Sequence, residues 1–295
     1  MLNFKRKTMV RKAFFLSFVL ILTSISFSSC IINDNIKDTS VFIDPGNDPN
    51  FKIVVNTDVG FEVFNRKMTV FEIPIYAFSA VEDTKLLHAA NILAQYLDNN
   101  EDGIVDNITT HNSMKSNKAF LFLWKTATER DSFTPPSGYL GQDLGADETT
   151  PIWHTNGHTG NFDASLEEIW HLITNSGYEK AYPTIFSAQT NSEITIAMDV
   201  ARGGHFENPP ATYPTSAWYT YADVTCDYGC QVSEYLYWIM TSMLGAQENR
   251  LTEISNEWTL NTSAKVQSGD VKAWTIFTNT IYKFPTVLPD GTYKH

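Results

Sequence analysis

Cysteine is scarce in this sequence of 295 residues, and basic residues are outnumbered by acidic ones. The 3 cysteines are too few for a small disulfide-rich scaffold. There are 21 lysine and arginine residues against 33 aspartate and glutamate residues, for a formal charge of −12. This balance argues against nucleic acid as a partner, because nucleic acid needs clustered cations, and favours small cations. Hydrophobic residues make up 43% of the chain, enough for a full core, which excludes a disordered protein.

Residues 1–30 have the order of an export signal. Basic residues between Lys5 and Lys12 precede an apolar run from Ala13 to Phe27, and two serines then lead to Cys30. This order resembles a bacterial lipoprotein signal, which implies a signal peptide over residues 1–29, a lipid on Cys30 and a location in the bacterial cell envelope, at the outer membrane or the cell surface. An ordinary secretory signal is the alternative. The run has about 15 residues and a spanning helix about 20, so we expect membrane contact through the lipid anchor only.

Without the signal peptide the chain is more acidic and has one cysteine pair. Residues 1–29 contain five basic residues and no acidic one. With Cys30 assigned to the lipid, Cys226 and Cys230 remain, and in an oxidising compartment we expect a disulfide between them. A metal-binding thiolate pair is the alternative, although a second cysteine pair is missing.

The order of hydrophobic patterns predicts a single α+β domain over residues 51–295. Polar, turn-forming residues occupy 30–50, which we interpret as a tether. Alternating apolar residues predict strands in 51–56 and 68–78, where Pro74 favours an edge position or a bulge. Apolar residues at helical spacing predict helices over 84–97 and 115–127, followed by a long loop over 130–162 and a mostly helical chain. Strands first and helices later indicate an α+β fold with a small N-terminal β-sheet.

Residues 98–109 have the spacing of a calcium-binding loop. Oxygen-bearing side chains stand at the first, third, fifth and ninth positions, glycine at the sixth permits the turn, and the seventh residue offers its carbonyl. The ligand residues are Asp98, Asn100, Asp102, Ile104 and Asp106. The pattern resembles EF-hand and dockerin-like loops and implies a stabilising Ca²⁺ ion. Thr109 replaces the bidentate glutamate of the twelfth position, so another segment must supply an acid or the site is weak. A turn rich in Asp and Asn is the alternative.

The sequence Glu167-Glu168-Ile-Trp-His171 carries the strongest indication of chemistry. Glu167 and His171 are one helical turn apart and face the same side, so both can bind one metal ion. The segment resembles the His-Glu-x-x-His helix of zincin metallopeptidases, with Glu167 in place of the first histidine. Over residues 150–245, the gluzincin type implies Zn²⁺ held by Glu167, His171 and Glu234 of a later helix. It also implies a water activated by Glu168, an oxyanion stabilised by Tyr228, and a peptide or protein substrate.

Other interpretations of the same residues remain open. The acids can simply favour the N-terminus of a helix, with His171 packed in the core. His154 and His158 precede the helix and are further candidates for a ligand or a substrate contact. A non-catalytic, calcium-stabilised surface lipoprotein that binds a glycan or a protein is the alternative function. A glycosidase ranks last, because adjacent glutamates on a helix point about 100° apart.

Overall fold

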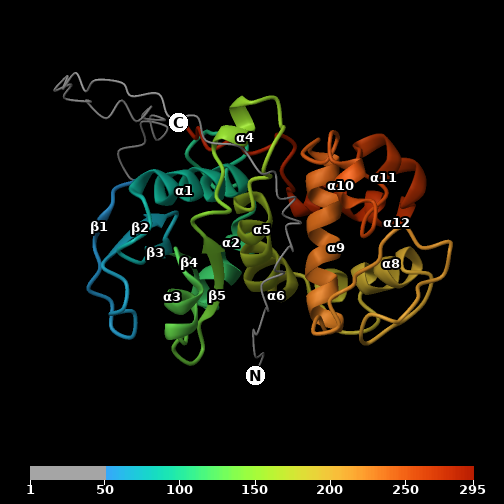
Figure 1. Ribbon diagram of the computed structural model, residues 1–295, viewed down its shortest axis with the longest axis horizontal. Coiled ribbons are helices and arrows are strands. Elements are labelled where there is room, and N and C mark those ends of the chain that lie inside the picture. The colour runs from blue at the N-terminus through green and yellow to red at the C-terminus, as the bar shows by residue number, and fades with distance from the viewer. Residues whose placement is uncertain (1–50) are drawn as a thin grey trace, which may run out of the picture. The chain divides into compact units, whose positions relative to one another are not determined.

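The computed structural model describes residues 51–295, which form an α+β domain built on a five-stranded sheet (Figure 1). The expected signal peptide, Cys30 and the tether lie outside the described residues. The strands cross the sheet in chain order; β1 to β3 pair antiparallel, and β3 to β5 pair parallel. They are β1 (Val54–Val55), β2 (Arg66–Val70), β3 (Ile73–Ala77), β4 (Ala119–Trp124) and β5 (Leu140–Gly145).

Strands β2 and β3 form a hairpin with a turn at Phe71 and Glu72. Both residues have positive φ angles, 44° and 65°, as a two-residue hairpin turn requires. Thr69 pairs with Pro74, and the pairing of β3 with β4 begins at Ile75. The edge position or bulge expected from Pro74 is therefore wrong, because β3 is an inner strand and pairs with β2 residue by residue. The proline is tolerated since it precedes the part of β3 that pairs with β4.

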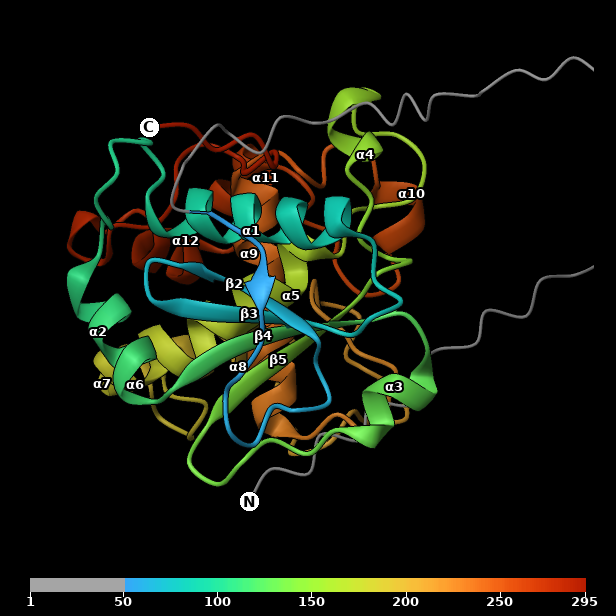
Figure 2. The ribbon, with the colours of Figure 1, turned by 90° about the vertical axis from the view of Figure 1, so that its left-hand side faces the viewer.

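Two helices lie next to each other on the sheet. Helix α1 (Asp83–Leu97) contacts β2 and β3, helix α5 (Ser165–Ile173) contacts β4 and β5, and the two helices contact each other. The helix expected over 84–97 is confirmed as α1, whose residues from His88 to Leu97 are all buried. Helices α2 (Ile108–Ser116) and α3 (Ala127–Ser132) precede and follow β4 and lie at opposite ends of the sheet (Figure 2).

The second half of the chain is helical, as expected, and packs against α5. Helix α9 (Tyr228–Met243) contacts α5, and α8 (Glu193–Ala201) contacts α9 (Figure 1). The other elements are α4 (Ile152–Thr155), a π-helical turn (Thr174–Tyr178), α6 (Glu179–Ala181), α7 (Pro183–Phe186), α10 (Leu251–Ile254), α11 (Ser263–Gly269), α12 (Val271–Phe277) and a 3₁₀ turn (Thr280–Tyr282). Within residues 51–295, no helix is both long enough and apolar enough to cross a bilayer.

Two strands lie where the sequence pattern predicted a helix and a loop. Strand β4 interrupts the helix expected over 115–127, and five of its six residues are buried. A strand buried on both faces is a continuous apolar run without a period of two, so its pattern resembles that of a buried helix. The loop expected over 130–162 contains β5. There Gly141 lies against Phe120, and a Cβ atom would come within 2.1 Å of that ring. This glycine permits close strand packing instead of marking a loop.

The C-terminal segment returns to α1. Oε1 of Gln95 accepts hydrogen bonds from the backbone N–H groups of Asp290 and Gly291, at 2.9 and 2.8 Å. The buried hydroxyl of Tyr293 donates to Oδ2 of Asp98 at the end of α1, at 2.5 Å. The end of the chain is therefore part of the folded domain and covers one side of α1.

Candidate metal centres

Helix α5 carries the Glu-Glu-x-x-His sequence and packs against both the sheet and α9. Its apolar residues Leu166, Ile169 and Trp170 are fully buried. The indole N–H of Trp170 donates to the backbone oxygen of Leu236 on α9, at 3.2 Å. Packing on both sides fixes the rotation of α5 and therefore the direction of its polar side chains.

The polar residues of α5 form a compact group. One ligand atom each of Glu167, Glu168 and His171 lies within 4.8 Å of the others. Nδ1 of His171 is 3.5 Å from Oε2 of Glu168, and the same oxygen accepts a hydrogen bond from Nε2 of Gln142 on β5, at 2.6 Å. Glu168 and His171 are buried, whereas Glu167 is half-buried. The residues present can hold a metal ion, with Glu167 on the more exposed side.

Glu234 of α9 approaches the opposite edge of the His171 ring. Its Oε2 atom is 3.9 Å from Nε2 of His171, and that nitrogen is buried without a hydrogen-bond partner among the described residues. Two ligands of one zinc ion lie about 3.3 Å apart, given metal–ligand distances of about 2.0–2.2 Å. A separation of 3.9 Å is close to this value. Residues distant in the sequence thus meet around one imidazole.

The charges around His171 favour a cation. Burial opposes the charged imidazolium, but the carboxylates of Glu234, Glu168 and Glu167 outweigh burial and raise the pKa of His171. Three carboxylates around a single imidazole leave an excess of negative charge in a largely buried place. A divalent cation would compensate this excess better than one proton can.

Tyr228 bonds to Asp199, and a different tyrosine of α9 lies near His171. The hydroxyl of Tyr228, predicted to stabilise an oxyanion, donates to Oδ1 of Asp199 on α8 at 3.0 Å. Tyr228 therefore belongs to a different polar cluster. Tyr237, also on α9, has its ring 6.0 Å from the His171 ring. Burial and the charge of Glu167 raise the pKa of the Tyr237 hydroxyl, so this group stays protonated and can donate a hydrogen bond near the site.

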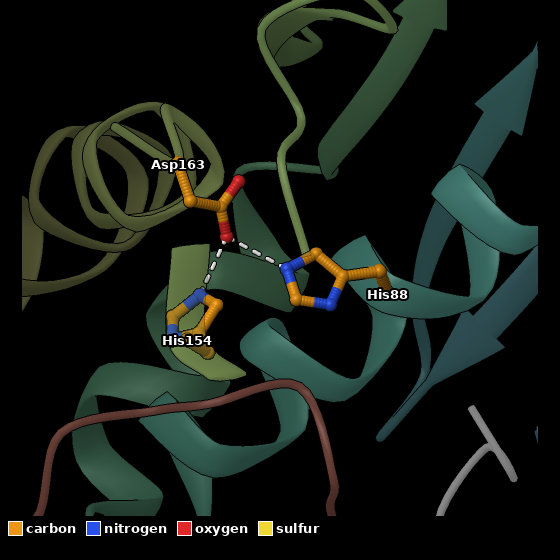
Figure 3. Close-up of side chains that lie close together, drawn as sticks. All are labelled: His88, His154 and Asp163. Atoms are coloured by element: carbon orange, nitrogen blue, oxygen red, sulfur yellow. Dashed lines mark hydrogen bonds and ion pairs between the residues drawn. The ribbon is translucent and has the colours of Figure 1, made fainter. Parts of the chain in front are cut away.

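A second buried cluster consists of His88, His154 and Asp163 (Figure 3). Oδ2 of Asp163 lies 2.7 Å from Nε2 of His88 and 2.8 Å from Nε2 of His154. The three residues come from α1, α4 and the segment just before α5. His154, which the sequence offered as a ligand near His171, thus belongs to this cluster instead. His158 stacks on Trp153, with ring centroids 4.3 Å apart.

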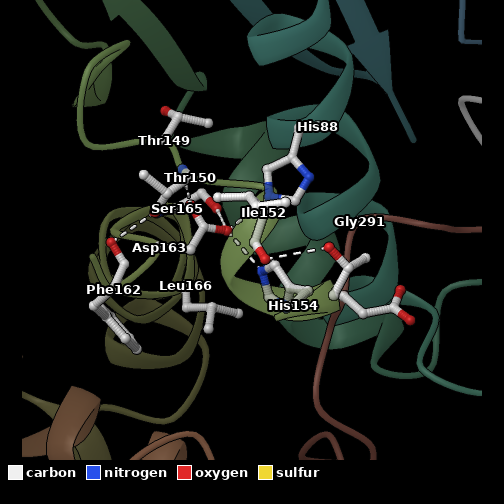
Figure 4. Close-up of polar contacts among 12 residues, drawn as sticks. His88, Thr149, Thr150, Ile152, His154, Phe162, Asp163, Ser165, Leu166 and Gly291 are labelled. Carbon is white, nitrogen blue, oxygen red and sulfur yellow. Dashed lines mark hydrogen bonds and ion pairs between the residues drawn. The ribbon is translucent and has the colours of Figure 1, made fainter. Parts of the chain in front are cut away.

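Backbone and hydroxyl groups fix the Asp163 carboxylate (Figure 4). Its Oδ1 atom accepts the N–H of Thr150 at 2.9 Å, and Oδ2 accepts the hydroxyl of Ser165 at 2.6 Å. Burial by itself would raise the pKa of Asp163, but His88 and His154 outweigh it and the pKa is lowered. The carboxylate is therefore ionised and held in one orientation.

In the loop after α1, aspartate side chains accept hydrogen bonds from the backbone of the same loop. Oδ2 of Asp98 accepts the N–H of Gly103 at 2.7 Å, and Oδ1 of Asp102 accepts the N–H of Ile104 at 2.9 Å. Gly103 has a φ of 83°, so the glycine supplies the turn that the sequence predicts. Burial and the neighbouring charges of Asp98 and Asp102 raise the pKa of Asp106. The negative charges of Asp98 and Asp102 therefore act on Asp106, although these three carboxylates are not among the described groups whose ligand atoms converge on one point.

The predicted disulfide between Cys226 and Cys230 is confirmed. It joins the residue before the Asp227 N-cap to the first turn of α9, and Oδ1 of Asp227 accepts the N–H of Cys230 at 2.9 Å. A thiolate metal site at this pair is therefore excluded. The bridge stiffens the start of the helix that carries Glu234.

Sequence reasoning overlooked His88, Asp163, Gln142 and Tyr237. His88 lies within the apolar stripe of α1, and Asp163 lies 75 residues away from it in the chain. A histidine inside an apolar helical stripe was the available signal, but its partner has no fixed spacing.

Comparison of the chain with protein-family models, with curated proteins and with solved structures finds no match.

Proposed function

We propose that this protein is an exported metal-dependent hydrolase, most simply a peptidase of zincin type, with its metal ion held by Glu167, His171 and Glu234. The observation that carries the proposal is the buried Nε2 atom of His171. It has no hydrogen-bond partner among the described residues and lies 3.9 Å from Glu234. An imidazole nitrogen beside carboxylates can bind a divalent cation in place of its proton.

Each residue has a distinct task in this proposal. A bound zinc-type ion would act as a Lewis acid and lower the pKa of a bound water. Glu168 is the group that accepts a proton, and Gln142 orients its carboxylate through the 2.6 Å hydrogen bond. The protonated hydroxyl of Tyr237 is the donor available for a developing oxyanion. The half-buried Glu167 marks the side from which a substrate approaches.

Export and a peptide substrate are supported less directly. The disulfide between Cys226 and Cys230 is typical of proteins that fold outside the cytoplasm and agrees with the lipoprotein signal expected at Cys30. The peptide substrate follows from the resemblance of Glu167-Glu168-x-x-His171 to the zincin helix.

Metal content and turnover test the site separately. We expect zinc in the purified full chain, measured by mass spectrometry, and the loss of one zinc ion per chain in His171→Gln and Glu234→Gln. Glu168→Gln should keep the metal but lose turnover of an unstructured protein substrate by about 100-fold or more. His205→Gln is the control, because His205 is 40% exposed and bonded to Asp199 and Glu207. A chain that holds calcium alone, or whose zinc content is unchanged in His171→Gln, would overturn the proposal.

The loop over 98–109 is proposed to bind Ca²⁺ as a stabilising ion. The supporting observation is the pattern of Asp98 and Asp102 accepting backbone N–H groups around Gly103. Added Ca²⁺ at about 100 times its dissociation constant should stabilise the fold by about 2.7 kcal/mol. Asp102→Asn should weaken this effect, and an unchanged melting temperature on calcium addition would contradict the assignment. If calcium binds but neither zinc nor turnover is found, the protein is a calcium-stabilised surface lipoprotein that binds a glycan or a protein.

A further inference from the structure

A buried site for a second metal ion lies before the start of α5. His88, His154 and Asp163 reach it from three separate elements, and their side chains are at most 3% exposed. Each imidazole presents Nε2 to the same oxygen of Asp163, at 2.7 and 2.8 Å, so two rings from different helices converge on one point (Figure 3).

The carboxylate of Asp163 is divided between two tasks. Oδ1 accepts the backbone N–H groups of Thr150 and Ser165, at 2.9 and 3.3 Å, which anchors the side chain. Oδ2 is directed toward the two rings and the Ser165 hydroxyl (Figure 4). Carboxylates that ligate metals are commonly held in this way, by hydrogen bonds to the surrounding chain.

The C-terminal segment closes the site on the side of His88. A Cβ atom at Gly291 would lie 2.2 Å from Nδ1 of His88, so the backbone touches the ring and a side chain cannot be accommodated. Gln95 holds this segment through the N–H groups of Asp290 and Gly291. The backbone thus prevents His88 from moving away from Asp163.

The chemistry of the three ligands indicates the class of ion. Two imidazole nitrogens and one carboxylate oxygen suit zinc-type transition metals, whereas calcium and magnesium prefer oxygen ligands alone. Ligands of one zinc ion lie about 3.3 Å apart. The present separations of 2.7 and 2.8 Å therefore need only a displacement of about half an ångström per ring to admit the ion.

We propose that His88, His154 and Asp163 bind one zinc-type divalent ion that joins α1 and α4 to the start of α5. Three protein ligands leave the fourth position of a tetrahedral ion to a water molecule, and the burial of the three side chains suits an ion that holds elements together. Because Asp163 lies two residues before the first residue of α5, the ion fixes the position of the helix that carries Glu167, Glu168 and His171. This inference does not depend on the proposed hydrolase activity, because it concerns different ligands.

The experiment measures zinc bound by the full chain after chelator treatment and dialysis against Zn²⁺. The double variant Glu167→Ala/Glu234→Gln removes ligands of the other site and should still bind one zinc per chain. Introducing His88→Gln or His154→Gln into it should abolish that binding. With Co²⁺ in place of zinc, the double variant should show the visible absorption of tetrahedral coordination. His158→Asn is the matched control, because His158 lies near His154 but outside the cluster, and its φ of 57° suits asparagine.

Two results would overturn the proposal. The first is a double variant that binds no zinc, shows no Co²⁺ absorption and gains no thermal stability from Zn²⁺. The second is zinc binding that is unchanged in His88→Gln and His154→Gln. If the variants that add His88→Gln or His154→Gln to the double variant do not fold, zinc binding by the double variant alone decides, since its His88, His154 and Asp163 are intact. Failure of the hydrolase proposal is distinguishable, because it would appear as zinc that is insensitive to His171→Gln.

Discussion

The two buried polar clusters near the start of α5 have opposite charge balances. Around Asp163, two imidazoles share one carboxylate, which also accepts backbone N–H groups. Around His171, one imidazole faces three carboxylates, and its Nε2 atom has no hydrogen-bond partner among the described residues. The first cluster is therefore internally compensated, whereas the second has excess negative charge.

The two clusters also differ in how far they are covered by the rest of the protein. Gly291 closes the Asp163 cluster with backbone, while the His171 cluster includes the half-buried Glu167. An ion enclosed by protein is suited to hold elements together, whereas a catalytic ion must remain accessible to its substrate. The comparison teaches that similar ligand types on neighbouring elements are suited to different roles by charge balance and covering.

The largest expected effect comes from removing the shared carboxylate. Asp163→Ala leaves two buried imidazoles without their common partner and should destabilise the metal-free protein by about 3–5 kcal/mol. Glu167→Ala removes a like charge from an acidic cluster and should change stability by less than about 1 kcal/mol. Urea unfolding of chelator-treated protein measures both. Asp147→Ala, at an exposed ion pair with Lys125, is the control. Equal effects of Asp163→Ala and Glu167→Ala would remove the distinction between the clusters.

An intermediate effect is expected from opening the closed cluster. Gly291→Ala places a Cβ atom against His88. It should lower the free energy of unfolding by about 1–3 kcal/mol more than the backbone strain alone would. Gly138→Ala is a matched control, because its φ of 83° is close to the 82° of Gly291 and nothing lies within 4 Å of its Cβ position. Unfolding free energies of the two variants give the difference. If they agree, backbone contact does not hold His88 in place.

The smallest effect concerns the titration of His171 in metal-free protein. Glu234→Gln removes the largest influence that raises its pKa, so that pKa should fall. As an imidazolium, His171 stabilises the fold below its unfolded pKa of about 6.5, and this contribution is lost as the pH rises through the raised pKa. The variant should therefore lose less stability between about pH 6 and pH 8. NMR titration of the ring measures the pKa directly, and Glu72→Gln, on the distant β2–β3 hairpin, should leave it unchanged.

Local pattern predicts an element where polar and apolar residues recur with the period of that element. The α1 stripe and the polar ligands of α5 stand out because polar and apolar residues alternate with the helical period. In β4 both faces are buried, so the period disappears and the strand resembles a helix. In β5, Gly141 packs against Phe120 but resembles a loop residue in the sequence. In both cases, contacts on the second face of the strand decide that the segment is a strand, and these contacts are not visible in the sequence pattern.

The same limit applies to the candidate sites. Glu167, Glu168 and His171 are predictable because one helix sets their spacing, and the proximity of Glu234 was expected only through a resemblance. His88 and Asp163 are 75 residues apart and share no helix, so no spacing rule joins them. Tyr228 and Tyr237 both lie on α9, and only the rotation of that helix decides which of them faces His171.

By itself, the sequence determined an acidic α+β domain with a disulfide, a glycine-containing acidic loop after α1 and a helix bearing two glutamates and a histidine. These features depend on composition and short-range spacing, which act within one turn or one loop. The tertiary structure decided that β4 and β5 are strands, that His154 joins His88 and Asp163 instead of His171, and that Gly291 closes this cluster. Such contacts are decided by the packing of whole elements, because burial and desolvation depend on neighbours that are remote in the chain.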